Sequence, residues 1–247
     1  MQGVANDERR MTIVEHLTEL RRVLIISMGA WLAGTIAAFV FKDAVLGIIL
    51  RPLKLVLHNA HSIVNTAIFT SPTEGLTVPI KISAIVGLVI AMPIILWQAW
   101  SFISPGLRPV ERKFALPFIG SAVLLFAGGG AFAFFVMPIG LNFLATFLAQ
   151  QAIYFPDINQ YLSFFLLLVI VFGVTFELPV AIVLLGMLGL VSSKWLAKRR
   201  WAIWVGIAFA SLIVTPGADP FTPTALAVPL IVLFEASLLI LRKVFHR

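Results

Sequence analysis

Thr12-Ile-Val-Glu-His-Leu-Thr-Glu-Leu-Arg-Arg22 is the last strongly charged stretch of the chain before a long apolar run begins. As a helix, this stretch has an apolar stripe on one face and Glu15, Glu19 and Arg22 together on another. Thr12 and Glu15 have the spacing of a capping box, which gives Glu15 a structural role. The pattern leaves two interpretations of Glu19: it balances the charge of the neighbouring arginines, or it has a function of its own.

The composition is that of an integral membrane protein. Of the 247 residues, 60% are hydrophobic and only 12% are charged, and the mean hydropathy is +1.04. A soluble domain carries about twice that share of charged residues. The first 22 residues lack the apolar core and small-residue site of a cleavable signal peptide, so we expect the first span to remain as an anchor. The absence of cysteine excludes disulfides and cysteine-ligated metals.

Six apolar runs predict an all-α protein with six transmembrane helices in one membrane domain, residues 1–247. The fourth run is longer than a bilayer core is thick, and Pro179 within it predicts a bend. The fifth is about 21 Å long as a helix, against about 30 Å for a bilayer core, so we expect it to form a hairpin with the sixth in locally thinned membrane. Gly128-Gly-Gly130 in the third allows close approach of a neighbouring backbone. The predicted spans are 23–41, 82–101, 114–137, 161–190, 201–214 and 221–241.

Several signals predict the structure between the spans. Ser71 is predicted as a helix N-cap with Glu74 at the third helical position. Asp157 and Asp219 are predicted to cap the fourth and sixth spans. Residues 138–157 are predicted to connect the third and fourth spans. Residues 44–57, which include Pro52, suit a helix lying at the membrane interface.

The positions of the basic residues predict the orientation of the chain. With six spans, fourteen of the eighteen Lys and Arg residues fall on the side of the two termini, and the other four lie in the long connector 42–81. Basic residues are enriched in cytoplasmic loops. Both termini are therefore predicted to be cytoplasmic, and residues 42–81 to form an extracytoplasmic cap.

The sequence carries no enzyme motif. It lacks the phosphate-binding GxxxxGK[ST] loop and the HExxH zinc motif. His58 and His61 stand three residues apart in the predicted cap, and solvated loop histidines explain them better than a metal site does. We therefore expect neither a cofactor nor a metal, and the energy for any work must come from a partner or from an ion gradient.

Two carboxylates are predicted at the cytoplasmic membrane surface. Glu19 precedes the first span and Glu111 precedes the third. One interpretation of Glu111 is structural, because an acid in the first turn of a helix interacts favourably with the helix dipole. The functional interpretation is that the two carboxylates lie at one membrane depth, where each can bind a guanidinium through two hydrogen bonds. Two acids so placed suit a ligand with two adjacent arginines.

Two further carboxylates are predicted inside the spans. Glu177 lies in the middle of the fourth apolar run, where a charge costs about 2.5–3.5 kcal/mol. It is therefore either functional or a neutral acid bonded to a carbonyl that Pro179 leaves free. Glu235 lies nearer the cytoplasmic edge of the sixth run, where it can reach the interface or pair with Arg242 or Lys243.

Six short motifs occur in order along the chain. They are His16-Leu-Thr-Glu-Leu-Arg21, Ser71-Pro-Thr-Glu74, Phe102-Ile-Ser-Pro105 followed by Glu111-Arg112, Phe172-Gly-Val-Thr-Phe-Glu-Leu-Pro179, Thr215-Pro-Gly-Ala-Asp219, and Pro229 through Phe234-Glu235. In this order, on these spans and with the short final hairpin, they resemble the TatC family, the receptor and core subunit of the twin-arginine protein translocase. The resemblance covers nearly everything from Thr12 to Arg242.

The resemblance implies a glove-shaped bundle in a prokaryotic cell membrane that binds twin-arginine signal peptides and exports folded proteins with the proton-motive force. It implies partners of the TatA and TatB types, self-association in a receptor complex, and no nucleic acid. The positions that match the family's signal-peptide site are Glu19, Arg21, Phe102 and Glu111. The position that matches its intramembrane partner contact is Glu177, and the structural or partner-interface candidates are Pro52, Glu74, Asp219 and Glu235.

Two departures from the family pattern concern the contact with the small partners. The turn Thr215–Asp219 is one residue longer than the form common in the family, and Pro223 replaces a polar or Met residue. An alternative function from another class is a proton-coupled secondary transporter of a small solute, with Glu177 as the proton carrier. The absence of an internal repeat gives no support to an inverted-repeat transporter.

Overall fold

The computed structural model describes residues 13–59, 67–106, 115–147, 156–215 and 220–243, and these ranges are almost entirely helical. They contain no β-strand, only an isolated bridge between Ile68 and Asp157. The helices are α1 (Ile13–Val40), α2 (Lys42–Ile49), α3 (Arg51–Asn59), α4 (Glu74–Ile103), the 3₁₀ turn η1 (Ser104–Gly106), α6 (Ala115–Phe147), α7 (Ile158–Phe176), α8 (Leu178–Met187), α9 (Ser193–Lys198), α10 (Arg200–Val214) and α11 (Phe221–Lys243).

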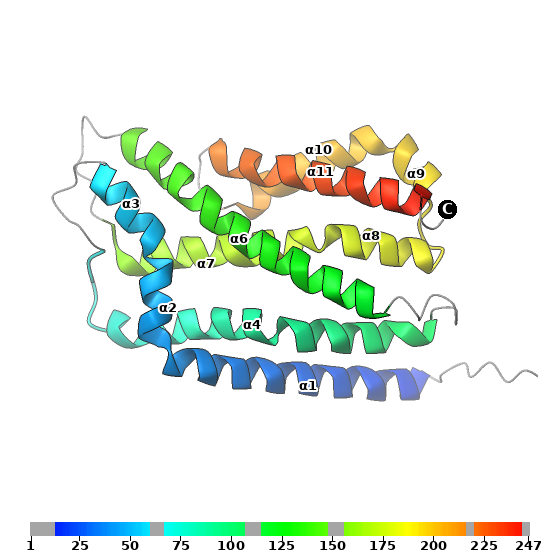
Figure 1. Ribbon diagram of the computed structural model, residues 1–247, viewed down its shortest axis with the longest axis horizontal. Coiled ribbons are helices and arrows are strands. Elements are labelled where there is room, and N and C mark those ends of the chain that lie inside the picture. The colour runs from blue at the N-terminus through cyan, green and yellow to red at the C-terminus, as the bar shows by residue number, and fades with distance from the viewer. Residues whose placement is uncertain (1–12, 60–66, 107–114, 148–155, 216–219, 244–247) are drawn as a thin grey trace, which may run out of the picture.

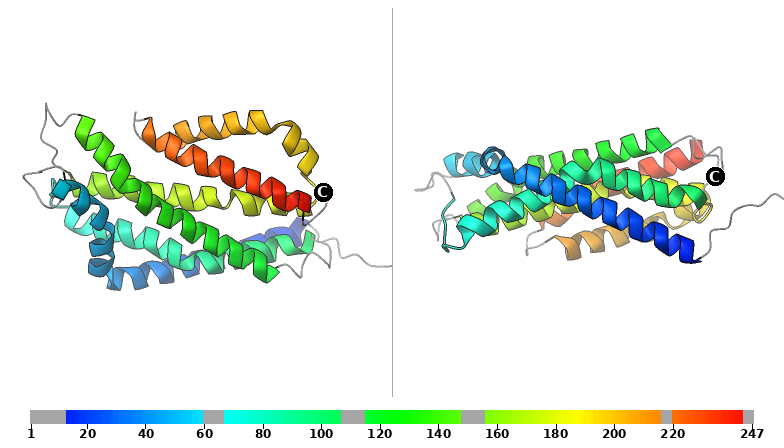
Figure 2. Two further views of the ribbon diagram at one scale, coloured as in Figure 1. Left: turned by 45° about the horizontal axis from the view of Figure 1, so that its top comes forward. Right: turned by 90° about the horizontal axis from the view of Figure 1, so that it is seen from below.

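The long helices run between the two ends of the molecule, and α6 crosses them obliquely (Figure 1). At one end, which we call the cap end, α2 and α3 lie beside the starts of α4 and α7 and the last turns of α6 (Figures 1 and 2). At the opposite end α1 begins, α4 ends, and α9 lies next to the end of α11. Five helical segments of the described chain are long and apolar enough to cross a membrane: α1, α4, α6, α7 together with α8, and α11. Helix α10 is apolar but shorter, so the sixth crossing stays a prediction.

The described helix boundaries differ from the predicted ones in three places. Helix α6 does not end before Pro138, because it continues through that proline to Phe147. The predicted interface helix is two helices, α2 and α3, joined at Leu50. The helix start predicted at Ser71 is displaced, since α4 begins at Glu74 after Thr73, although Ser71 Oγ does accept a 3.4 Å hydrogen bond from the Thr73 backbone N–H. Glu74 instead binds the backbone N–H of Thr70, four residues earlier.

Two local predictions are confirmed. The Asp157 side chain caps α7 by accepting a hydrogen bond from the Gln160 backbone N–H at 2.7 Å. The fourth span is interrupted as Pro179 predicts: α7 ends at Phe176, and α8 restarts with Pro179 in its first turn. A proline there is tolerated because the first turn of a helix leaves its N–H groups unpaired anyway.

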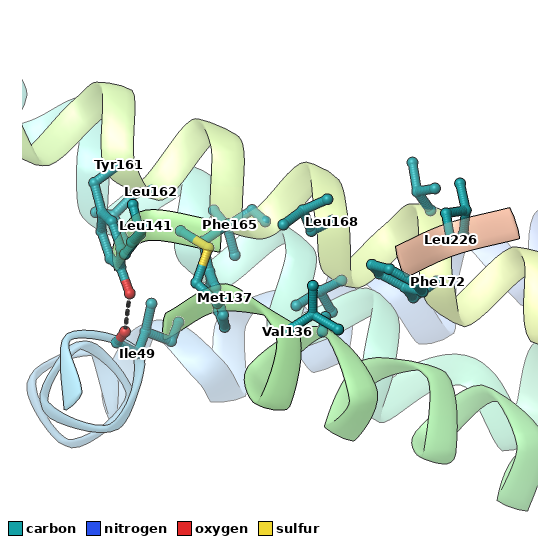
Figure 3. Close-up of a cluster of buried hydrophobic side chains, with 14 of the residues drawn as sticks. Ile49, Val136, Met137, Leu141, Tyr161, Leu162, Phe165, Leu168, Phe172 and Leu226 are labelled. Carbon is teal, nitrogen blue, oxygen red and sulfur yellow. Dashed lines mark hydrogen bonds between the residues drawn. The ribbon is translucent and has the colours of Figure 1, made fainter. Parts of the chain in front are cut away.

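The core lies where α6 crosses α7, and aromatic rings fill it together with aliphatic side chains (Figure 3). Phe172 is completely buried and its ring makes an edge contact with that of Phe132 at 5.2 Å. In lipid, close van der Waals packing replaces the hydrophobic effect as the force between helices. Gly129 meets that need, because an added Cβ would lie 2.7 Å from the carbonyl carbon of Phe172.

Helices α1 and α4 cross at a pair of glycines, Gly34 and Gly87. A Cβ on Gly34 would lie 2.6 Å from the carbonyl oxygen of Gly87, and a Cβ on Gly87 would lie 2.6 Å from Thr35 Oγ1. Trp31 Nε1 adds a hydrogen bond of 2.7 Å to the carbonyl of Ala84. This crossing fixes the register of α1 on α4, which places the start of α1 beside the end of α4.

Candidate functional site

The candidate site begins where the first turns of α1 pack on the last turn of α4. The rings of His16 and Phe102 stack there, with centroids 4.4 Å apart and planes 26° from parallel. Glu19 lies one helical turn beyond His16, on the same face of α1. The structure thus places Glu19 and Phe102 at the same end of the α1–α4 pair. The stack itself was not predicted, although His16 opens the motif that carries Glu19.

Glu19 has a buried carboxylate oxygen without a donor. Its Oε2 is shielded from solvent and accepts no hydrogen bond within the described part of the chain. Arg21, two residues on, is exposed and forms no ion pair with a described residue. An unpaired buried acceptor costs free energy that a cationic donor would recover. The geometry therefore suits a positively charged ligand group entering beside Phe102.

Two other predicted residues, Glu111 and Asp219, lie outside the described residues. The spacing of Glu19 and Glu111 therefore stays a prediction.

Glu177 occupies the junction between α7 and α8. Both of its carboxylate oxygens are buried and have no hydrogen-bond partner among the described residues. Glu177 lines a half-open cavity of about 180 Å³ between α4, α6 and α8, together with apolar side chains such as Leu96, Trp100 and Phe118. A carboxyl group in an apolar cavity needs a donor or a proton. The neutral-acid interpretation, in which a carbonyl freed by Pro179 accepts its proton, has no such hydrogen bond in the described structure.

Glu235 does not pair with Arg242 or Lys243. Its Oε1 lies 3.0 Å from Nε of Arg200 and accepts a 3.2 Å hydrogen bond from Trp204 Nε1. The contact with Arg200 is an ion pair by distance, without hydrogen-bond alignment. Helices α10 and α11 are antiparallel, which brings the start of α10 level with Glu235, two turns before the end of α11.

The remaining two candidates lie in the cap end. Pro52 is buried at the start of α3. Glu74 is only 5% exposed, and its oxygens bind the backbone N–H and the hydroxyl of Thr70. Within the described ranges no three His, Asp or Glu side chains come together as a metal site. The described geometry therefore offers isolated carboxylates that can bind donors, one at the start of α1 and one inside the bundle.

The chain matches known proteins along nearly its whole length. The family model described as "Sec-independent protein translocase protein (TatC)" matches residues 15–229. A protein of that name from Carboxydothermus hydrogenoformans is 40% identical over 239 residues, which cover 95% of this chain and 94% of the relative. The one from Escherichia coli strain K12 is 36% identical and covers 92% of this chain and 87% of the relative.

Solved structures agree with these relatives. A crystal structure described as the twin arginine translocase receptor TatC superposes with a TM-score of 0.79 at 38% identity, covering 94% of this chain and 100% of the other. A second, in DDM, gives a TM-score of 0.80 at 37% identity over 92% of this chain and 99% of the other. The chain therefore belongs to the TatC family, whose members are components of the Sec-independent protein translocase and not enzymes.

Proposed function

We propose that this protein is the membrane receptor for twin-arginine signal peptides and that Glu19 receives one of the two arginines. The observation that carries the proposal is the buried, unpartnered Oε2 of Glu19 beside the stacked rings of His16 and Phe102. A guanidinium supplies five N–H donors in a planar fork, which fits a carboxylate and also stacks on aromatic rings. An ammonium supplies a point charge and cannot form the two parallel bonds.

The second arginine of the motif binds Glu111, which we place at the same cytoplasmic membrane surface. Two carboxylates on separate helices can each bind one guanidinium. The two ion pairs therefore select a peptide that has both arginines, and they set its orientation. Arg21 repels further cations, and so restricts which basic residues can follow the arginine pair in the signal peptide.

The apolar part of the signal peptide then packs against the membrane-embedded face of the bundle. There Glu177 forms a hydrogen bond with a polar group of a single-span partner of the TatA or TatB type. The buried, unpartnered oxygens of Glu177 beside this cavity support the assignment, because an intramembrane carboxyl group without a partner is unstable in lipid. The assembled complex, in which several copies of the receptor associate, exports folded proteins with the proton-motive force.

We also propose six spans with both termini in the cytoplasm. The α10–α11 hairpin supports the sixth crossing, because Arg200 pairs with Glu235 and keeps the two antiparallel helices together in spite of their unequal lengths. The location that follows is a prokaryotic cell membrane, with α2 and α3 on the extracytoplasmic side.

Site-specific crosslinking of a twin-arginine signal peptide tests the proposal. The unaltered protein should crosslink from Phe102, and Glu19→Gln, which removes the charge but keeps the shape, should lose most of that crosslink. Glu15→Gln on the same helix is the matched control and should keep it. A peptide with two lysines in place of the arginines should crosslink weakly to the unaltered protein and to either variant. Equal crosslinking of Glu19→Gln and Glu15→Gln, with both proteins inserted in the membrane, would reject the site.

A further inference from the structure

At the end of the molecule opposite the cap, the short helix α9 presents a cationic face to its surroundings (Figure 1). Ser193 and Leu196 are buried and form the inner side of the helix. Lys194, Trp195 and Lys198 are exposed on the other side. Residues four apart lie one above the other on a helix, so the two lysines project in the same direction, with the Trp195 ring beside them.

Arg199, which follows α9, joins this face through a cation–π contact. Its guanidinium carbon lies over the Trp195 ring, 4.6 Å from the ring centroid. Such a contact uses the charge of the guanidinium but no hydrogen-bond acceptor, so the N–H donors stay available for another group. The contact thus holds Arg199 against the exposed side of α9 with its donors free.

The positive charges at this end are not neutralised within the described part of the chain. Glu235 is the only acid of α9, α10 and α11, and its ion pair is with Arg200. Helix α9 packs on α11, whose last turn adds two more exposed cations. We call these five unpaired side chains the basic patch: Lys194, Lys198, Arg199, Arg242 and Lys243. Like charges gathered on one surface repel each other and attract an anion.

Tryptophans and the apolar surface of α10 indicate what kind of anion the basic patch meets. The Trp201 ring is 75% exposed and lies 5.5 Å from the Trp204 ring, centroid to centroid. Tryptophan is enriched at the depth of lipid headgroups. Beyond Trp201, helix α10 is apolar and exposes Val205 and Phe209 on the same side. Cations at the border of an exposed apolar helix face suit a molecule with an anionic head and an apolar tail better than a soluble anion or an acidic peptide.

We propose that α9 and the adjoining ends of α10 and α11 bind an anionic phospholipid. The lipid phosphate accepts hydrogen bonds from Arg199 and from the lysines of α9, and an acyl chain lies along the exposed apolar face of α10. A guanidinium can hold a phosphate through two parallel bonds, and an ammonium adds a point charge. The inference goes beyond the proposed receptor function and does not rest on it, because it requires only that α10 begins at a membrane surface, whichever side that is.

Native mass spectrometry of the full-length protein in detergent tests the proposal. The protein is titrated with phosphatidylglycerol, which is anionic, or with phosphatidylcholine, which has no net charge, and the affinity of the first bound lipid is measured. Each basic residue near an anionic lipid contributes about fivefold to binding. A variant with Lys194→Gln, Lys198→Gln and Arg199→Gln should therefore bind phosphatidylglycerol at least about fivefold more weakly, with unchanged binding of phosphatidylcholine. If the triple variant does not fold, Arg199→Gln alone decides, with a loss of about fivefold expected.

The matched control removes three positive charges from the other end of the molecule. Lys42→Gln, Arg51→Gln and Lys54→Gln lie on the two cap helices and should leave the affinity for phosphatidylglycerol unchanged. An equal fall in both triple variants would overturn the proposal, because the lipid would then respond only to the net charge of the protein. Displacement of phosphatidylglycerol by inorganic phosphate or by a hexaglutamate peptide at equal concentration would also overturn it, since the patch would then bind a soluble anion or an acidic protein segment.

Discussion

Replacing Gly87 by Ala should separate α1 from α4 at their crossing. The added Cβ would lie 2.6 Å from Thr35 Oγ1 and 2.5 Å from Thr35 Cα, well inside the 3.4 Å of an ordinary contact. The added Cβ clashes with backbone atoms of Thr35, which cannot rotate away, so the two helices must move apart by about 1 Å. Such a gap loses a quarter to a half of the dispersion energy of each contact at the crossing.

The expected loss of stability follows from two opposing terms. Overpacking costs about 1–3 kcal/mol, and the better helix propensity of Ala returns up to about 1 kcal/mol. A net loss of about 1–2 kcal/mol corresponds to a fall of about 2–8 °C in the unfolding midpoint for a chain of this size. The same displacement should loosen the stack of His16 on Phe102, which lies at the far end of the same helix pair.

Gly29→Ala is the matched control for this prediction. Gly29 lies on α1 with nothing within 4 Å of an added Cβ. Its replacement should leave the unfolding midpoint unchanged or raise it slightly, because only the propensity term acts. The assay is thermal unfolding of both variants in the same detergent. If Gly87→Ala is as stable as Gly29→Ala, α1 does not pack on α4 through this glycine pair.

Three further predictions concern single contacts. Tyr161→Phe should cost about 1 kcal/mol in denaturant unfolding, because it removes the buried 2.7 Å bond from the phenol to the carbonyl of Ile49, and an unchanged midpoint would contradict that bond. Glu235→Gln should cost about 1–2 kcal/mol through its half-exposed pair with Arg200, and exchanging the two residues should recover part of the loss. Hydrogen bonds from the Thr70 hydroxyl and the Gln160 backbone N–H lower the pKa of Asp157, which stabilises the folded state above pH about 4, and that stability is lost as the pH falls through the folded pKa. Asp157→Asn should therefore flatten the acid side of the stability profile, which acid titration with circular dichroism can measure.

Features that depend on neighbours in sequence could be predicted. The cap at Asp157, the break near Pro179 and the close approach at Gly129 each follow from the chemistry of one or a few adjacent residues. The all-helical character follows in the same way from long apolar runs, because a backbone in lipid must satisfy its own hydrogen bonds. These predictions needed no knowledge of which segments lie side by side.

The errors came from two physical causes. The sequence predicts a helix end at Pro138, as would be expected in water, but in a membrane protein neighbouring groups can compensate for the freed carbonyl and the helix continues. The sequence spacing predicts a partner for Glu235 within its own helix, whereas its partner in the structure, Arg200, lies on the preceding helix. Contacts between distant segments leave no local pattern, so the meeting of Thr70 with Asp157, 87 residues apart, was not predictable from spacing.

The close contact between Gly34 and Gly87 is also a point about which α1 can pivot on α4. Gly34 and Glu19 are fifteen residues apart on one helix, so Glu19 lies about 22 Å along the helix axis from this contact. A tilt of about 5° around Gly34 would carry Glu19 sideways by about 2 Å, roughly the difference between a hydrogen bond and no contact. Most of the surface of α1 faces away from the protein, and most of its packing is against α4, so little resists that tilt. If a peptide binds Glu19 as proposed above, it acts far from the glycine crossing, where a small sideways force has its largest effect on the angle between α1 and α4.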